Sequence, residues 1–286
     1  MLIFRYLITS TIKVTNLRVF SSSVFFSTSS TYKENKVKVG KYDINYLKVG
    51  DGAHNVLCMP GALGSIWTDF KPQVEGFDRK KFSLVAWDPP GYGKSRPPER
   101  EFPINFYEKD ADAAFEFMKA LKITKFSLLG WSDGGISSMI LAAKYPEVVN
   151  KMVVWGANSF ILPHELELYK KIKDVSSWSE KMRKPMIELY GEKGFPKLWT
   201  DWINAMEAVF NANDGNICTE VLKDVTCPTY ILYGEKDPLV DIVHVSHLHT
   251  NIQNSRIHLY PEGKHNIHIR YAEDFNQKVQ DFLLQG

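Results

Sequence analysis

From about residue 36 onward, short apolar runs alternate with longer stretches of helical periodicity. Runs that are apolar at nearly every position are typical of strands covered on both faces, and their alternation with helices is typical of a parallel sheet. The sequence therefore predicts an α/β fold, with a mostly parallel central sheet flanked by helices and an antiparallel hairpin of the first two strands at one edge. The predicted strands are 37–39, 44–49, 56–59, 82–87, 126–131, 152–155, 230–233 and 257–260, and the predicted helices are 106–121, 136–144 and 272–284.

The interval from about 159 to 225 breaks this alternation, because it has helical patterning without a convincing strand. We interpret it as a helical cap inserted into a single α/β domain at 36–286. Its aromatic side chains either shape a substrate pocket or simply pack within the cap, and the sequence does not decide between the two. These side chains are Tyr169, Trp178, Tyr190, Phe195, Trp199 and Trp202.

A G-x-S-x-G pattern, Gly130-Trp131-Ser132-Asp133-Gly134, lies between the strand predicted at 126–131 and the helix that follows. In this context the pattern predicts a strained strand-to-helix turn that exposes a nucleophilic serine. The two glycines remove side chains that would collide at so tight a corner. The N-terminus of the helix, with its partial positive charge, then lies beneath Ser132.

A serine hydroxyl is a weak nucleophile unless a base and an orienting acid accompany it. Asp237 follows the strand at 230–233, and His265 follows the strand at 257–260. Catalytic residues of open parallel sheets gather at the carboxyl ends of strands, which is where both residues and Ser132 are expected. We therefore predict a catalytic triad of Ser132, Asp237 and His265.

Both partners of the serine have alternatives in the sequence. Asp237 could form only an ordinary Asx turn before Pro238, with Asp241 as the acid instead. Only His265, however, follows both a strand and a glycine turn. The other candidate bases are His244, His247, His249 and His268.

No pattern in the chain indicates a metal or a cofactor, and we predict neither. The histidines at 244–249 have helical spacing on a polar segment, without cysteines or carboxylates arranged as zinc ligands. The three cysteines, Cys58, Cys218 and Cys227, match neither a disulfide framework nor a zinc motif, and we assign them no catalytic role.

Acyl transfer to serine also needs N–H donors for the oxyanion that forms. One donor is expected to be the backbone N–H of Asp133, the residue after the nucleophile. The other is expected in the loop after the strand at 56–59, where Gly61 allows a sharp turn and either Ala62 or Leu63 presents its amide.

Together these residues resemble the α/β-hydrolase family, and within it the biphenyl hydrolase-like branch. The resemblance implies a serine hydrolase of α-amino acid esters, located in mitochondria, with the triad named above and with Asp133 holding the substrate's amino group. Two positions depart from the expected pattern, Pro90 in place of an arginine and Ala62 in place of a methionine, and both could alter pocket or leaving-group preference. The matching stretches are 59–65, 85–98, 128–135, 155–158, 234–240 and 261–266.

The chemistry of Asp133 favours the same substrate class independently. A carboxylate beside the oxyanion hole opposes the negative charge that develops on the substrate oxygen, so a general esterase is better served by an apolar residue. A substrate α-ammonium close to the scissile carbonyl removes that penalty. The alternative is that Asp133 pairs with a cation of the protein or points to solvent.

The leading hypothesis is therefore hydrolysis of α-amino acid esters, or of amino thioesters or lactones, through an acyl-enzyme. A carbon–carbon bond hydrolase with the same fold and triad is one alternative, and a non-enzymatic receptor that retains the pocket is another. Haloalkane dehalogenase and epoxide hydrolase chemistry are disfavoured, because both need a carboxylate where Ser132 stands.

Residues 1–30 contain Arg5, Lys13 and Arg18, eleven serines or threonines and no acidic residue. This composition predicts a mitochondrial transit peptide, with the matrix as destination. Its apolar runs are too short to span a bilayer. Without these three positive charges, the net charge of +2 becomes −1, which offers no bulk attraction to nucleic acid or acidic membranes. We expect a monomer whose partner is a small-molecule amino acid ester.

Overall fold

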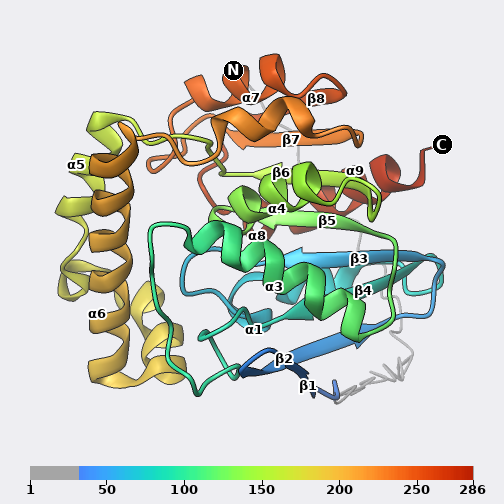
Figure 1. Cartoon of the computed structure of the whole chain (residues 1–286), viewed down its shortest axis with the longest axis horizontal. Coiled ribbons are helices and arrows are strands. Elements are labelled where there is room, and N and C mark those ends of the chain that lie inside the picture. The colour runs from blue at the N-terminus through green and yellow to red at the C-terminus, as the bar shows by residue number, and fades with distance from the viewer. Residues whose placement is uncertain (1–31, 286) are drawn as a thin grey trace, which may run out of the picture. The chain divides into compact units, whose positions relative to one another are not determined.

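The computed structural model describes residues 32–285, so the segment interpreted as a transit peptide lies outside the described residues. The described chain forms an eight-stranded sheet in the order β1-β2-β4-β3-β5-β6-β7-β8 (Figure 1). The strands are β1 (Asn35–Val39), β2 (Tyr42–Val49), β3 (His54–Met59), β4 (Phe82–Trp87), β5 (Phe126–Trp131), β6 (Val149–Trp155), β7 (Thr229–Gly234) and β8 (Ser255–Tyr260).

The sheet is parallel from β4 to β8, whereas β2 pairs antiparallel with both β1 and β4. Strands β4 and β7 are buried at every position, as their continuous apolar sequences predict for central strands. The predicted fold class and the edge hairpin are thus confirmed. Several strands begin earlier than their apolar runs do, because polar residues such as Ser255 and Arg256 pair through the backbone with β7.

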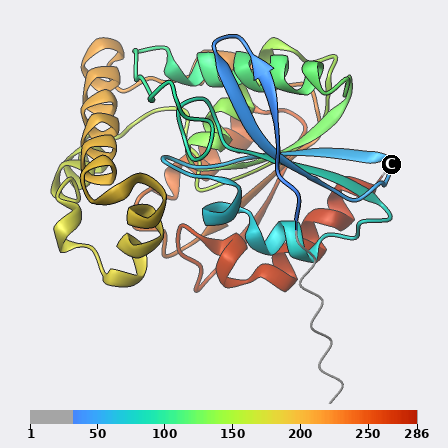
Figure 2. The same cartoon turned by 90° about the horizontal axis from the view of Figure 1, so that it is seen from below.

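Helices cover both faces of this sheet. On one face α3 packs on α4, and α4 contacts β3, β5 and β6. On the other face α2, α8 and α9 pack together, and Figure 2 shows α3 and α9 on opposite sides of the strands. These helices are α1 (Ile66–Asp69), α2 (Lys71–Gly76), α3 (Phe106–Ala120), α4 (Asp133–Lys144), α7 (Val243–Asn251), α8 (Ile267–Arg270) and α9 (Ala272–Leu284).

The chain between β6 and β7 forms a helical cap that stands at the carboxyl ends of the parallel strands (Figure 1). It contains α5 (Pro163–Lys171), α6 (Glu180–Asn213) and the 3₁₀ turns η1 (Val175–Ser177) and η2 (Thr219–Asp224). A bridge between Phe160 and Asn216 closes its base. Helix α6 is interrupted at Gly191, whose φ of 79° and ψ of 164° are not helical. Within residues 32–285, no helix is long and apolar enough to cross a membrane.

Candidate active site

Ser132 lies at the turn between β5 and α4, with a φ of 54° and a ψ of −124°. A positive φ is strained for a residue with a side chain, and here it turns the chain directly from strand to helix. The Ser132 N–H donates to the carbonyl of Trp155 on β6 at 3.0 Å, and its own carbonyl accepts from Gly135 at 2.8 Å. These bonds hold the serine at the carboxyl end of β5, a central strand, as in a nucleophile elbow.

His265 and Asp237 lie together after β8 and β7. His265 Nδ1 is 2.8 Å from Asp237 Oδ2, and the carboxylate is 1% exposed. Asp237 Oδ1 accepts from the N–H of Leu239 at 2.8 Å, so the Asx turn and the pairing with histidine coexist. Trp131 Nε1 donates to the carbonyl of His265 at 2.9 Å and so fixes the backbone of the residue that carries the imidazole.

Ser132, Asp133 and His265 line one cavity beneath the cap. Within the described chain, no hydrogen bond joins Ser132 Oγ to the His265 imidazole. Catalytic hydrogen bonds are often long in the absence of substrate and tighten when it binds. Ser132 and His265 therefore line the same cavity and Asp237 pairs with His265, which is the arrangement that a Ser-His-Asp triad requires.

The alternative acid and bases lie elsewhere. Asp241 pairs with His164 at 3.1 Å, and His244 pairs with Glu165 at 3.0 Å beneath α5. His268 is fully buried, accepts from Trp155 Nε1 at 2.9 Å and donates to the carbonyl of Asp69 at 3.0 Å. Burial lowers the pKa of His268 to about 3, so it stays neutral as a packing element.

The loop after β3 lies directly against the serine. A Cβ added to Gly61 would lie 3.2 Å from Ser132 Cβ, so a larger residue there would press on the serine. Residues 61–64 form a turn in which the Gly64 N–H donates to the Gly61 carbonyl at 3.0 Å. The backbone N–H groups of Ala62, Leu63 and Asp133 have no acceptor within residues 32–285, so all three remain candidate oxyanion donors.

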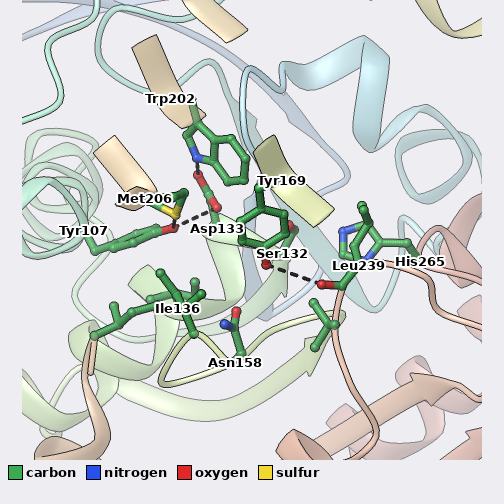
Figure 3. A pocket seen from close by; sticks show the side chains of 13 residues that line it. Tyr107, Ser132, Asp133, Ile136, Asn158, Tyr169, Trp202, Met206, Leu239 and His265 are labelled. Carbon is green, nitrogen blue, oxygen red and sulfur yellow. Dashed lines mark hydrogen bonds between the residues drawn. The ribbon is translucent and has the colours of Figure 1, made fainter. Parts of the chain in front are cut away.

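The Asp133 carboxylate is held by two neutral donors. Tyr107 Oη donates to Oδ1 at 3.0 Å and Trp202 Nε1 donates to Oδ2 at 2.7 Å (Figure 3). No cation forms an ion pair with Asp133 in the described part of the chain. The nearby Arg100 instead makes a bidentate pair with Asp110 at 2.6 Å. Asp133 is 8% exposed, so it neither pairs with a protein cation nor points to bulk water.

Burial dominates the electrostatics of Asp133. It raises the pKa of this carboxyl to about 6, against the opposing hydrogen bonds from Trp202 and Tyr107 and the positive charge of Arg100. At neutral pH the cavity therefore contains a carboxylate whose charge lacks a close counterion. A ligand with a positive charge compensates that carboxylate.

The rest of the cavity wall is mostly apolar. The cavity has a volume of about 30 Å³, and residues of both the cap and the core line it. Of the cap aromatics, Tyr169 and Trp202 line the cavity, whereas Trp178 and Trp199 pack on each other. The further lining residues are Tyr107, Ile136, Asn158, Ile161, Met206, Ile217, Leu239 and Val240.

Sequence reasoning missed the two donors to Asp133. Tyr107 was expected only as part of a helix, and Trp202 only as one of several cap aromatics. One signal for Trp202 lies in the sequence. Trp202 and Met206 are four residues apart and so share one helix face, and both line the cavity. Within the described residues, no group of three or more metal-ligating side chains gathers, and the absence of a metal stays a prediction.

Comparisons with known proteins agree with this fold. A family model described as alpha/beta hydrolase fold matches residues 55–185. The protein named serine hydrolase BPHL from Mus musculus is 50% identical over 248 residues, covering 87% of this chain and 85% of the relative. The protein of the same name from Homo sapiens is 49% identical over 258 residues, covering 90% and 88%. A solved structure, an alpha/beta hydrolase fold protein from Chitinophaga pinensis, has a TM-score of 0.73 at 19% identity, covering 90% of this chain and 98% of that one.

Proposed function

Because the chain belongs to the alpha/beta hydrolase family and, within it, to the serine hydrolases that resemble BPHL, we propose that it hydrolyses esters of α-amino acids through an acyl-enzyme. The observation that carries the substrate class is Asp133, a buried carboxylate beside the nucleophile that no cation of the described chain neutralises.

The first step is attack of Ser132 Oγ on the ester carbonyl. His265 Nε2 takes the serine proton and then returns it to the leaving alcohol. The Nδ1–H of His265 points at Asp237, whose carboxylate is fixed by the Leu239 N–H and stabilises the imidazolium. Water then attacks the acyl-enzyme with His265 again as base, which releases the amino acid.

The oxyanion of each tetrahedral intermediate lies between two backbone N–H groups. One belongs to Asp133 and the other to Ala62 or Leu63, and none of the three has another acceptor within residues 32–285. Fixed donors of this kind act most strongly in a site that excludes water.

The Asp133 carboxylate would by itself oppose the charge on the oxyanion, since both are negative and the surroundings are apolar. In an α-amino ester, the ammonium nitrogen is bonded to Cα, and Cα is bonded directly to the carbonyl carbon that the serine attacks. The ammonium group therefore compensates the carboxylate while the carbonyl occupies the oxyanion hole. Amino thioesters and amino lactones share this geometry and belong to the same proposed class.

The decisive experiment compares matched substrates on matched variants. We expect wild type to prefer L-alanine benzyl ester over benzyl propionate and over N-acetyl-L-alanine benzyl ester, measured as kcat/KM from benzyl alcohol release. In Asp133→Asn and Asp133→Ala, the amino ester should lose at least about 100-fold, because removing one partner of a buried ion pair costs roughly 3 kcal/mol. The neutral esters should lose much less.

Two controls interpret that result. Asp241→Asn alters an acidic side chain that lies away from the cavity and should change neither rate. Ser132→Ala should abolish turnover of all three esters. Equal losses on amino and neutral esters in the Asp133 variants would contradict the proposed substrate class.

An assay of the wild-type protein on a dienoic ketone distinguishes ester hydrolysis from the alternative, carbon–carbon bond hydrolysis. A carbon–carbon bond hydrolase of this fold would cleave a dienoic ketone and leave amino esters untouched. Asp133 disfavours that reaction, because a dienoic ketone has no amine to compensate the carboxylate. Turnover of a dienoic ketone in place of amino esters would establish the alternative.

A further inference from the structure

Helix α6 of the cap contacts both walls of the oxyanion hole. From its second half, Trp202 Nε1 donates to the Asp133 carboxylate at 2.7 Å. From its first half, Tyr190 Oη donates to the carbonyl of Leu63 at 2.7 Å. The proposed N–H donors belong to these same two loops, so one helix of the cap touches both.

The Tyr190 hydroxyl is held in place rather than loosely docked. It accepts from the N–H of Gly93 at 3.1 Å, and the side chain is buried. The Arg96 guanidinium lies 4.6 Å from the centre of the tyrosine ring, and its Nη2 donates to the carbonyl of Leu189 at 2.8 Å. Both neighbours fix the direction in which the hydroxyl donates.

The contact falls on a strained residue. Leu63 has a φ of 59°, in the left-handed region that is strained for a residue with a side chain. At the other end of the same turn, Asp69 Oδ2 accepts from the Gly61 N–H at 2.9 Å. The turn is therefore anchored once from the core, by Asp69, and once from the cap, by Tyr190.

The anchor from the cap stands next to a break in the helix. Gly191 follows Tyr190 directly, and its positive φ of 79° kinks α6 into two parts. The cavity, about 30 Å³, is far below the roughly 300 Å³ of small ligand pockets, and its cap wall is formed in part by Trp202 and Met206 of the second part of α6. An amino acid ester therefore fits only if cap residues move, and a movement that carried the first part of α6 with it would break the bond from Tyr190 to Leu63.

We propose that Tyr190 is a positioning residue that completes the oxyanion hole only when the cap is seated. The proposal rests on the oxyanion hole described under the proposed function. When the cap is open, the Leu63 carbonyl loses the hydrogen bond that Tyr190 Oη donates to it and the strained turn relaxes, so the 62–63 amides no longer point at the oxyanion. When the cap closes on substrate, the hydroxyl restores them. Cap closure and transition-state binding are thereby coupled.

The test is Tyr190→Phe, which retains the ring beneath Arg96 and removes only the hydroxyl. Because a donor to the oxyanion acts chiefly in the transition state, kcat should fall about tenfold or more with little change in KM. The fall should be the same for L-alanine benzyl ester and benzyl propionate, since both form the same oxyanion. Trp178→Phe is the control, because it removes a hydrogen bond within the cap, from Trp178 Nε1 to the carbonyl of Ile172.

A binding measurement separates positioning from a general loss of structure. Boronic acids form a tetrahedral adduct on serine that places an oxygen in the oxyanion hole. The affinity of Tyr190→Phe for 1-aminoethylboronic acid and for ethylboronic acid should fall by the same factor as kcat. Its affinity for the product L-alanine should stay as in wild type. Unchanged boronic acid affinity, or a kcat equal to that of wild type, would overturn the proposal.

The outcomes also distinguish this proposal from the substrate class. If wild type hydrolyses benzyl propionate but not the amino ester, the substrate class is wrong, and the comparison of Tyr190→Phe with wild type on the neutral ester still decides the role of Tyr190. If the Asp133 variants behave as expected and Tyr190→Phe has the kcat and the boronic acid affinity of wild type, the substrate class stands and only the proposed role of Tyr190 is wrong.

Discussion

At the scale of single residues, the carboxyl group of Asp133 matters most. Its oxygens accept hydrogen bonds from Tyr107 and Trp202, which are neutral and cannot cancel its charge. These donors fix its direction without satisfying it electrostatically. Under the proposed function, the carboxylate of Asp133 favours a substrate with a positive charge and disfavours a neutral ester, so one group would both select and reject substrates.

The pKa of Asp133 makes this selectivity depend on pH. Burial raises that pKa to about 6, so the free carboxyl is charged above this pH and neutral below it. The α-amino group of a substrate loses its proton near pH 8. The preference of wild type for L-alanine benzyl ester over benzyl propionate should therefore be greatest between about pH 6 and about pH 8 and decline on both sides.

That preference is measured as the ratio of the two kcat/KM values at each pH, which cancels any titration that both substrates share. In Asp133→Asn the ratio should be low and independent of pH below 7. A wild-type ratio that is constant from pH 5 to pH 7 would show that Asp133 does not bind the ammonium group.

Much of this site could be predicted from the sequence, for a physical reason. Ser132, Asp237 and His265 each follow an apolar strand directly, and parallel strands bring their carboxyl ends to one edge. The donors to Asp133 follow no such rule. Tyr107 and Trp202 are 26 and 69 residues from it, on α3 and on the cap, and only tertiary packing brings them together.

At the scale of elements, the turn from β5 to α4 depends on Gly134. A Cβ there would lie 2.0 Å from the carbonyl oxygen of Met59, a backbone atom of β3 that cannot rotate away. Gly134→Ala should therefore push α4 from the sheet, destabilise the protein by about 1–3 kcal/mol and reduce esterase activity by displacing Ser132.

Gly194 provides the matched control, because it lies in α6 and an added Cβ would have no neighbour closer than 3.8 Å. Gly194→Ala should stabilise the protein slightly, by about 0.5–1 kcal/mol, through helix propensity. Urea unfolding and benzyl ester hydrolysis measure both effects. Similar behaviour of the two variants would mean that contact with β3 does not constrain the turn.

The sequence patterns predict a run within each of the described strands, including the half-exposed β1, and the helices that correspond to α3, α4 and α9. Helices α1 and α2 were not predicted, because four and six residues are too few to show a helical period. The patterning of the cap indicates helices but not the break at Gly191, because a glycine in a helical pattern can also adopt helical backbone. The contact between Tyr190, the residue before the break, and Leu63 spans 127 residues and leaves no local pattern.

At the scale of the whole molecule, charge is unevenly distributed along the sequence. The net charge of +2 consists of three positive charges in residues 1–30 and a remainder of −1. Every candidate site residue lies between Ala62 and His265, outside this basic segment. We propose that this segment directs the protein to the mitochondrial matrix and has no part in catalysis.

That division predicts two independent outcomes. Residues 1–30 fused to a fluorescent protein should direct it to mitochondria, and replacing Arg5, Lys13 and Arg18 with glutamine should abolish this, because import signals of this type depend on their positive charge. The full-length protein with the same three replacements should retain the wild-type kcat/KM for L-alanine benzyl ester, since the charge that selects the substrate is that of Asp133. Mitochondrial location of the triple variant would contradict the proposed signal, and a changed kcat/KM would show that the segment reaches the active site.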